Sequence, residues 1–299
     1  TATLTVTNVA PTAVISGPIA GDEGETLTFD ASLSHDPGND IDSYEWDWEY
    51  DTTFSADASG ITAIHQYADD GTYTLALRAT DDNGASDVDT ATVTIVNVAP
   101  DVNAGPGQTV DEAAVASFTG SFTDPGADNH TIEWDFGDGA SATGTLTPTH
   151  VYTEPGSFNV TLTVTDDDEG IGSDDLTVTV QNLPPIDVDA GGPYAGTAGA
   201  PVTLTASGSD PGGGPVTYAW DLDNDGQYDD ATGAATSFTS EVSGTYTVAV
   251  QVADLQSAVT TDTAQVTIGP AELDHIVLSP PTLEIPAGET QPYTVEAFD

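Results

Sequence analysis

Three copies of one pattern follow each other in this sequence. Trp46, Trp134 and Trp220 lie 88 and 86 residues apart, and an Asp-Pro-Gly triplet begins ten residues before each of them. Self-similarity at a fixed period is the signature of tandem units, and a unit of this length falls within the ordinary size range of a domain. The sequence therefore predicts three consecutive copies of one small domain.

Each copy carries the hydrophobic pattern of β-strands. In the second copy, Ile132, Trp134 and Phe136 alternate with Glu133 and Asp135, which is the period-two pattern of a strand with one buried face. Roughly seven short runs of this kind, with no helical periodicity between them, fill each repeat. The pattern predicts an all-β chain of tandem immunoglobulin-like β-sandwiches, arranged as beads on a string.

Prolines mark the junctions between the copies. Asn8-Val9-Ala10-Pro11 recurs as Asn97-Val98-Ala99-Pro100 and, altered, as Asn182-Leu183-Pro184-Pro185. Proline fixes φ and disfavours helix at the residue before it, so we expect short, extended and fairly stiff joints. The expected domains span residues 10–98, 99–183 and 184–269, which we call modules 1, 2 and 3, with the last strand of a preceding, truncated domain over 1–9 and the start of another β-domain over 270–299.

The charge of the chain restricts its partners. Asp and Glu total 50 against a single basic side chain, Arg78, and the formal net charge is −49. Such a surface repels nucleic acid and anionic lipid, and its natural partners are cations. Two interpretations remain open: a halophilic or marine protein with a solvated acidic surface, and a protein that binds Ca²⁺ at specific sites.

The chain contains no Cys and no Met. The absence of Cys excludes a disulfide framework, and neither a signal peptide nor a membrane-spanning run is visible. Because the sequence lacks an initiator Met and opens within a strand-like run, we interpret it as an internal piece of a longer protein.

Several short motifs occur in the same order along the copies. They include Trp134-Asp135-Phe136-Gly137-Asp138-Gly139, the pairs His65-x-Tyr67 and His150-x-Tyr152, a Gly-x-aromatic strand and a Thr-Asp-Asp-x-Gly turn. Together, from Val9 to about Pro270, they resemble PKD domains, immunoglobulin-like modules that are common in secreted enzymes and surface proteins of bacteria and archaea. The tail from Ala271 resembles the first strands of a bacterial immunoglobulin-like (Big) domain. The resemblance implies an extracellular or cell-surface location and a role as spacer, adhesive unit, or carbohydrate- or protein-contacting accessory.

Acidic and amide side chains gather where each module begins. In an immunoglobulin-like topology the N-terminus, the B–C loop and the F–G loop meet at one end of the sandwich, which we call the N-terminal pole of the module. We expect Ca²⁺ there, because it takes about six to eight oxygen ligands, carboxylates and carbonyls among them. The expected ligands are Asn8, Asp36, Asp40 and Asp81 in module 1; Asn97, Asp124, Asp128 and Asp166 in module 2; and Asn182, Asp210 and Asp254 in module 3.

The resemblance supports this arrangement, since some PKD modules of secreted collagenases are similar in binding calcium at this pole. The usual second turn Asp of the family is Gly38, Gly126 and Gly212 here, and Asp40 and Asp128 would substitute for it in modules 1 and 2. The alternative is that these Asp and Asn side chains only cap turns.

A second candidate calcium site follows the Trp strand of module 3. Asp221, Asp223 and Asp225 with Gly226 match the start of an EF-hand-type loop. Thr232 stands where that loop carries its bidentate Glu, so the remaining carboxylates would come from Asp229 or Asp230. The alternative is an acidic hairpin held open by repulsion. Modules 1 and 2 carry poorer versions of the pattern, at Asp47, Glu49 and Asp51 and at Asp135 and Asp138.

Nothing in the sequence indicates catalysis. No pair of histidines has zinc spacing, and no nucleophile–base pair or cofactor motif is present. His65 and His150 occupy a position that is Phe238 in module 3, which indicates packing. The repeat tryptophans keep the register of a core. Asn129 and Asn159 fit the glycosylation pattern, and of the two only Asn129 lies in an expected loop; the alternative is a chance match of the pattern.

These observations favour a non-catalytic extracellular structural or adhesive spacer array that Ca²⁺ stiffens, part of a larger surface or filament-forming protein. Its partners would be cations, other surface proteins or polysaccharide, or further copies of itself joined end to end, with no nucleic acid and no membrane span in this piece. The alternative is a set of accessory modules that bind polymeric substrate beside the catalytic domain of a secreted hydrolase. A third possibility is that the strand at Thr1–Thr7 and the tail from Ala271 pair between subunits, as in donor-strand assembly.

Overall fold

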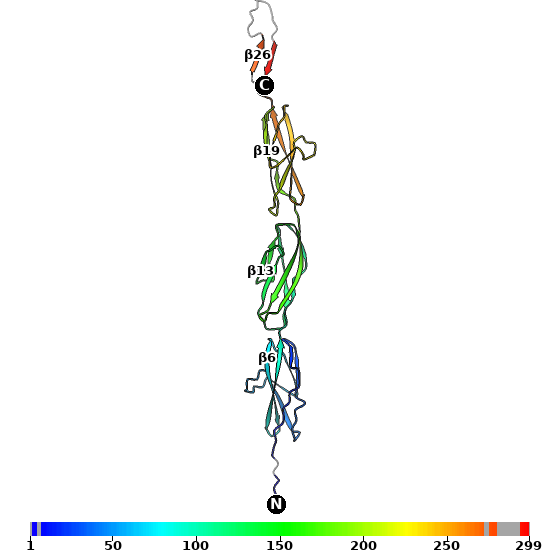
Figure 1. Ribbon diagram of the computed structural model, residues 1–299, viewed down its shortest axis with the longest axis vertical. Coiled ribbons are helices and arrows are strands. Elements are labelled where there is room, and N and C mark those ends of the chain that lie inside the picture. Colours follow the sequence, from blue (N-terminus) through cyan, green and yellow to red (C-terminus); the bar gives the residue numbers. More distant parts are fainter. Residues whose placement is uncertain (1, 5–6, 272–274, 280–293, 299) are drawn as a thin grey trace, which may run out of the picture. The chain divides into compact units, whose positions relative to one another are not determined.

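The computed structural model describes residues 2–4, 7–271, 275–279 and 294–298. All regular secondary structure in these residues is β-strand, which confirms the prediction of an all-β chain of tandem immunoglobulin-like domains. No helix in them is long or apolar enough to cross a membrane. The strands form three modules in chain order, which the colours of Figure 1 follow from blue to orange.

Module 1 consists of two sheets packed around one core. Its strands span Ala20–Asp22 (β1), Leu27–Asp30 (β2), Ile41–Asp47 (β3), Ala58–Ser59 (β4), Thr62–His65 (β5), Gly71–Asp81 (β6) and Ser86–Val96 (β7). The larger sheet has the strand order β1-β7-β6-β3-β4, and β2 pairs with β5 in the smaller one. β1 runs parallel to β7, whereas the other pairs are antiparallel.

Module 2 contains nine strands. They span Asp101–Asn103 (β8), Gln108–Asp111 (β9), Val115–Ser117 (β10), Ser121–Thr123 (β11), Thr131–Asp135 (β12), Ser141–Thr143 (β13), Thr149–Val151 (β14), Gly156–Thr165 (β15) and Ile171–Gln181 (β16). The larger sheet, β9-β16-β15-β12-β13, has the same order as in module 1, and the short pairs are β10-β14 and β8-β11.

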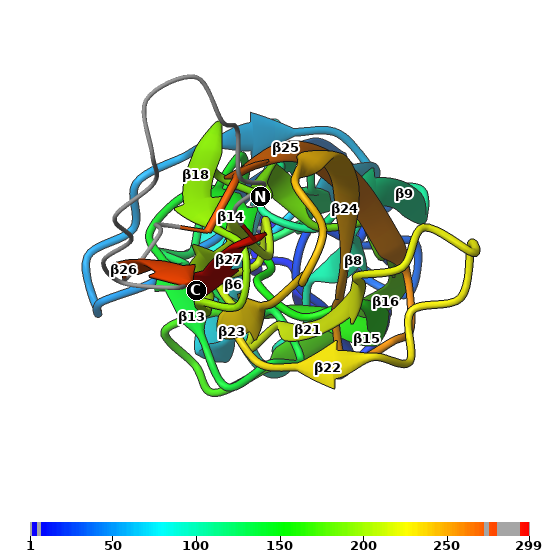
Figure 2. The same ribbon diagram turned by 90° about the horizontal axis from the view of Figure 1, so that it is seen from above.

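Module 3 repeats this arrangement with nine strands. They span Ile186–Asp189 (β17), Tyr194–Thr197 (β18), Val202–Thr205 (β19), Ser207–Ser209 (β20), Thr217–Asp221 (β21), Ala231–Thr232 (β22), Ala235–Phe238 (β23), Gly244–Ala253 (β24) and Val259–Gly269 (β25). The strands of its larger sheet follow one another in the order β18, β25, β24, β21 and β22 (Figure 2). The two strands beyond the expected seven form the pair β17-β20, whose place in module 1 is taken by isolated bridges.

The repeat tryptophans lie at the centre of the three cores, as their register predicted. Trp46, Trp134 and Trp220 are fully buried, and each sits opposite an aliphatic residue of the neighbouring strand. The indole Nε1–H of each donates to a backbone carbonyl 2.9 to 3.1 Å away. A buried indole that keeps its hydrogen bond adds a large apolar contact without an unpaired polar group.

In the described residues, the two ends of the chain contribute no strand to the three modules. Residues 2–4 and 7–10 form no strand, and residues 1, 5 and 6 of the expected first strand lie outside the described residues. In the tail, His275–Ser279 (β26) and Thr294–Phe298 (β27) form an antiparallel pair. The rest of the expected Big-like domain, beyond residue 271, lies outside the described residues.

The chain divides into two compact units. The first comprises residues 1–108, 117–150 and 158–178, and the second comprises residues 109–116, 151–157 and 179–299. The junction between modules 1 and 2 therefore lies inside the first unit, and the junction between modules 2 and 3 lies inside the second.

Candidate metal centres

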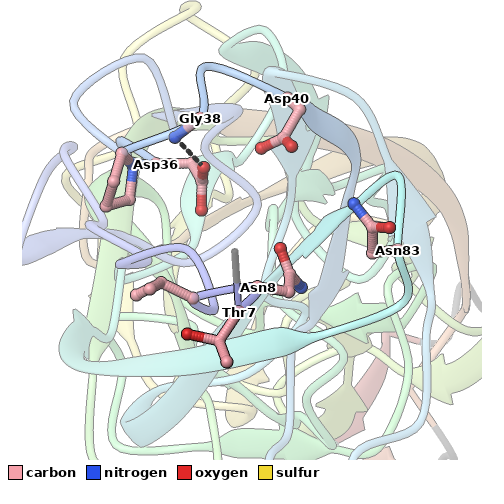
Figure 3. Close-up of a pocket in the computed structure, with 8 residues that line it drawn as sticks. Thr7, Asn8, Asp36, Gly38, Asp40 and Asn83 are labelled. Atoms are coloured by element: carbon pink, nitrogen blue, oxygen red, sulfur yellow. Dashed lines mark hydrogen bonds between the residues drawn. The ribbon is translucent and has the colours of Figure 1, made fainter. Parts of the chain in front are cut away.

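The N-terminal pole of module 1 brings together the side chains that the sequence indicated. Asp36 and Asp40 lie in the loop before β3, and Asp81 ends β6. The side-chain amide of Asn8 donates to Asp81 Oδ2 at 2.8 Å, which ties the chain before the module to the β6–β7 loop. Asn8, Asp36 and Asp40 line an open cleft of about 460 Å³ (Figure 3).

Two carboxylate oxygens at this pole have no hydrogen-bond partner. Asp36 Oδ1 accepts from the Gly38 N–H at 2.5 Å, whereas Asp36 Oδ2 and Asp40 Oδ1 are buried and unpaired. Burying a carboxylate oxygen without a partner costs free energy, and binding a proton or a cation would offset that cost. The neighbouring Asp36 carboxyl raises the pKa of Asp40, because a proton taken up by one of the two groups would relieve their repulsion, and burial raises it further. By contrast, the Asn8 amide lowers the pKa of Asp81.

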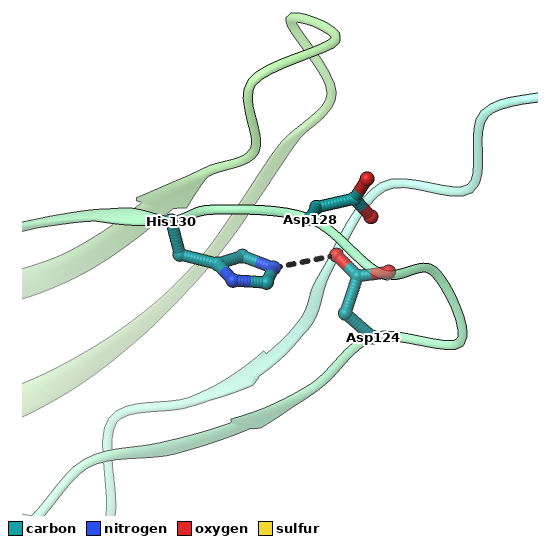
Figure 4. A group of neighbouring side chains, drawn as sticks. All are labelled: Asp124, Asp128 and His130. Carbon is teal, nitrogen blue, oxygen red and sulfur yellow. Dashed lines mark hydrogen bonds and ion pairs between the residues drawn. The ribbon is translucent and has the colours of Figure 1, made fainter. Parts of the chain in front are cut away.

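The pole of module 2 repeats the arrangement. The Asn97 amide donates to Asp166 Oδ2 at 3.1 Å. Asp124 and Asp128 lie in one loop, and Asp124 Oδ2 is 2.9 Å from His130 Nε2 (Figure 4). One ligand atom from each of Asp124, Asp128 and His130 lies within 4.8 Å of the others. Asp128 Oδ2 and Asn97 Oδ1 are buried without a partner.

His130 and Glu23 are among the members of this pole that the sequence did not indicate as ligands. His130 lies four residues before Trp134, where module 1 has Asp42 and module 3 has Val216, so comparison of the repeats gives no signal for it.

Glu23 lies in the turn after β1 of module 1, and its Oε1 accepts from the Val98 N–H at 2.7 Å. Burial raises the pKa of Glu23, and the nearby carboxylates of Asp128, Asp124 and Asp166 raise it further, although the Val98 hydrogen bond opposes the shift. Burial likewise raises the pKa of Asp128, followed by repulsion from Asp124 and Asp166. This pole is therefore a place where several carboxylates face one another.

The pole of module 3 is poorer in acids, as the sequence indicated. The Asn182 amide donates to Asp254 Oδ2 at 2.9 Å, and Asp210 Oδ2 accepts from the Gly214 N–H at 2.9 Å. Gly214 stands where module 2 has Asp128. Module 3 therefore lacks a second carboxylate at this place, and the Gly214 N–H donates to Asp210 instead. Asn182 Oδ1 is buried and unpaired.

The acidic loop after β21 brings together three of its five candidate ligands. One carboxylate oxygen from each of Asp221, Asp223 and Asp225 lies within 4.8 Å of the others. Asp230 is not among these three, and its Oδ2 accepts from the Leu222 N–H at 2.6 Å, which holds the loop closed. Asp229 is exposed and lies outside the group of three.

The corresponding loops of modules 1 and 2 use their acids to cap turns. Asp47 Oδ2 accepts from the Ser55 N–H at 2.7 Å, and Asp138 Oδ1 accepts from the Ala140 N–H at 3.0 Å. Side chains bonded in this way satisfy backbone donors that would otherwise be unpaired. The turn-capping interpretation therefore fits these two loops.

The histidines after these loops are packing residues, as the sequence indicated. The His65 ring stacks on Trp48 with centroids 4.7 Å apart. The His150 ring stacks on Phe136 at 4.3 Å, and its Nε2 lies 2.6 Å from Asp138 Oδ2. Each ring therefore packs on a buried aromatic side chain of its module.

Comparison with known proteins gives the chain's relatives. A segment is 37% identical over 90 residues to a microbial collagenase of Vibrio alginolyticus, which is 30% of this chain and 11% of that protein. A segment is 34% identical over 88 residues to collagenase ColQ1 of Bacillus cereus (strain Q1), which is 29% of this chain and 9% of that protein. The chain thus spans about a tenth of the length of these relatives.

Solved structures include single modules that are similar to parts of this chain. The PKD1 domain of Vibrio anguillarum Epp is 28% identical, with 30% of this chain and 96% of that chain covered and a TM-score of 0.25. The PKD domain of an M14-like peptidase from Thermoplasmatales archaeon SCGC AB-540-F20 is 24% identical, with 29% and 98% covered and a TM-score of 0.26. The family model described as PKD domain matches residues 8–95, 97–180 and 182–268, one match for each module. The chain therefore belongs to the PKD domain family.

Proposed function

We propose that this chain is a non-catalytic extracellular spacer array in which modules 1 and 2 bind Ca²⁺ at their N-terminal poles. The observation that carries the proposal is the presence of two buried, unpaired carboxylate oxygens, Asp36 Oδ2 and Asp40 Oδ1, at the pole of module 1. An all-oxygen set of this kind suits a hard cation such as Ca²⁺. The only basic side chain, Arg78, is paired with Glu45, so it does not neutralise the pole.

Binding at the poles would stiffen the joints. Asn8 and Asn97 belong to the chain that enters each module, and each is already hydrogen-bonded to the Asp of the loop between the last two strands. A cation held by that Asn and by two loops would remove rotational freedom from the joint. The PKD family and the collagenase relatives support an extracellular location.

The test is thermal unfolding of the whole chain in Ca²⁺ and in EDTA. Saturating Ca²⁺ at about 100 times its Kd should stabilise the binding modules by about 2.7 kcal/mol. Asp36→Asn should remove the part of the shift that belongs to module 1, whereas Asp42→Asn, which removes the same charge from an exposed position of β3, should retain it. If NaCl in EDTA reproduces the whole shift, the acidic surface is a halophilic adaptation and the calcium proposal fails.

Accessory binding beside a hydrolase is the second candidate, and the similarity to two collagenases favours it. The distribution of aromatic rings opposes it, because the exposed large apolar side chains of the described residues are all aliphatic. A polymer-binding face usually presents rings to its ligand. Co-sedimentation with insoluble collagen, cellulose and chitin separates the two functions: retention on any of them would favour the accessory role, and no retention would favour the spacer.

A further inference from the structure

Glu23 is a buried acid from module 1 that reaches the pole of module 2, and both modules contribute to this place within the first compact unit. Its side chain is 2% exposed. One oxygen, Oε1, accepts from the Val98 N–H at 2.7 Å, immediately after the junction residue Asn97. The other oxygen, Oε2, is buried and has no partner.

The unpaired oxygen of Glu23 faces an unpaired oxygen of Asp128. A Cβ added at Gly126 would lie 2.1 Å from Asp128 Oδ2 and 2.7 Å from Glu23 Oε2, so both oxygens border the same small space. Asp69, which follows β5 in module 1, also has a carboxylate oxygen within 4.8 Å of this pair. Asn97 Oδ1, at the same pole, is a further buried oxygen without a partner.

The backbone holds the two modules together around this space. The Ala127 N–H of module 2 donates to the Ala68 carbonyl of module 1 at 2.7 Å. Gly24 packs closely against Pro125: a Cβ added at Gly24 would lie only 2.8 Å from the Pro125 Cβ. Carboxylates that repel one another are therefore held close by contacts that do not neutralise them, which is an arrangement that a cation would stabilise.

We propose that Glu23 is an inter-module ligand, so that a Ca²⁺ ion at the pole of module 2 is held by Glu23 of module 1 together with Asp128 and Asn97. This inference rests on the proposed function, and it adds that one ion joins two modules instead of stiffening one. The cation would then bind most tightly when the two modules are docked, because only docking supplies the Glu23 oxygen.

The second junction offers a natural comparison. Glu112 occupies the place of Glu23: its N–H donates to the Gln181 carbonyl at 2.9 Å as Glu23 N–H donates to Val96 at 3.1 Å. Its Oε1 accepts from the Leu183 N–H at 2.7 Å. However, Gly214 replaces the second acid there, so Glu112 has no counterpart of Asp128 to share an ion with. Glu112 should therefore act as a backbone cap only.

Calorimetric titration of the whole chain with CaCl₂ tests the assignment. Glu23→Gln keeps an oxygen for the Val98 N–H and removes the charge, and it should weaken one calcium site by about tenfold or more while the module 1 site keeps its affinity. Glu112→Gln, the matched control, should leave every calcium affinity unchanged. Equal calcium affinities in wild type, Glu23→Gln and Glu112→Gln would overturn the inter-module assignment while the proposed function stands. A wild-type chain that binds no Ca²⁺ would overturn both.

Amide hydrogen exchange gives a local readout of the same assignment. Ca²⁺ should slow exchange of the Val98 amide by about tenfold or more, because the ion fixes the carboxylate that this amide bonds. The Leu183 amide, bonded to Glu112, should not respond. If Val98 and Leu183 respond equally, or if acidification in EDTA protects Val98 as well as Ca²⁺ does, the carboxyl pair shares a proton instead of an ion and the assignment is wrong.

Discussion

Neutralising Glu23 should change the stability of the chain in opposite directions with and without Ca²⁺. In the group formed by Glu23, Asp69 and Asp128, one carboxylate oxygen of each lies within 4.8 Å of the others. At 4.8 Å two unit charges repel by about 3.5 kcal/mol at an effective dielectric constant of about 20, and by about 1 kcal/mol in bulk water. The metal-free folded state carries this repulsion, and the unfolded chain largely loses it.

In EDTA, Glu23→Gln should therefore raise the free energy of unfolding by about 1 to 3 kcal/mol. The variant keeps an acceptor for the Val98 N–H, and its new NH₂ group can donate to Asp128. In saturating Ca²⁺ the same variant should be less stable than wild type, since the ion binds it more weakly. Urea unfolding followed by tryptophan fluorescence measures both values in one chain.

Glu112→Gln serves as the matched control for this reversal. Burial raises the pKa of Glu112 as it does that of Glu23, so neutralisation should also stabilise the metal-free chain. Because Gly214 stands in place of a second acid, Ca²⁺ should not reverse the sign at this position. If Glu23→Gln lowers stability by the same amount in EDTA and in Ca²⁺, Glu23 acts only as a hydrogen-bonding cap, and the electrostatic account of the pole is refuted.

Three further changes have definite expected outcomes. Gly126→Ala should abolish calcium binding at the pole of module 2, measured by calorimetry, because its methyl group would occupy the space beside Glu23 Oε2 and Asp128 Oδ2. Gly244→Ala is the control and should leave calcium binding unchanged, because the added carbon would meet no atom closer than 3.6 Å. Trp220→Phe should lower the thermal stability of module 3 by about 1 to 3 kcal/mol, because the Gly233 carbonyl loses its donor; unchanged melting would contradict this. The advantage of Glu23→Gln in EDTA should shrink as pH falls from 7 towards the ordinary carboxyl pKa of 4.5. The folded-state pKa of Glu23 is raised, so its charged form destabilises the fold at neutral pH, and protonation removes this destabilisation. If urea unfolding shows that the extra stability of Glu23→Gln does not change with pH, the raised pKa is contradicted.

The fold follows from local patterns that the sequence displays openly. Alternation around Trp134 predicts a strand with a buried face, and the repeat spacing carries this prediction to Trp46 and Trp220, all of which are core residues. The contact between Asn8 and Asp81 was also predictable, although 73 residues separate them, because the immunoglobulin-like topology brings the chain start and the last hairpin to one pole.

The role of Glu23 was not predictable from topology alone. Its hydrogen bond to Val98 spans 75 residues and crosses from one module to the next, so it depends on how two modules dock and not on the fold of either. One signal was present: Glu112 lies 89 residues after Glu23, the same spacing that separates Asn8 from Asn97. The acidic loop of module 3 shows a second limit, because sequence spacing does not reveal that Asp230 Oδ2 accepts from the Leu222 N–H.

The most direct test of calcium binding at the poles is a crystal structure of the whole chain grown in CaCl₂, with anomalous differences recorded. The account predicts calcium peaks at two poles, one beside Asp36 Oδ2 and Asp40 Oδ1, and one beside Glu23 Oε2 and Asp128 Oδ2. Poles without anomalous signal at saturating Ca²⁺, with the same oxygens bonded only to water or to protons, would contradict it.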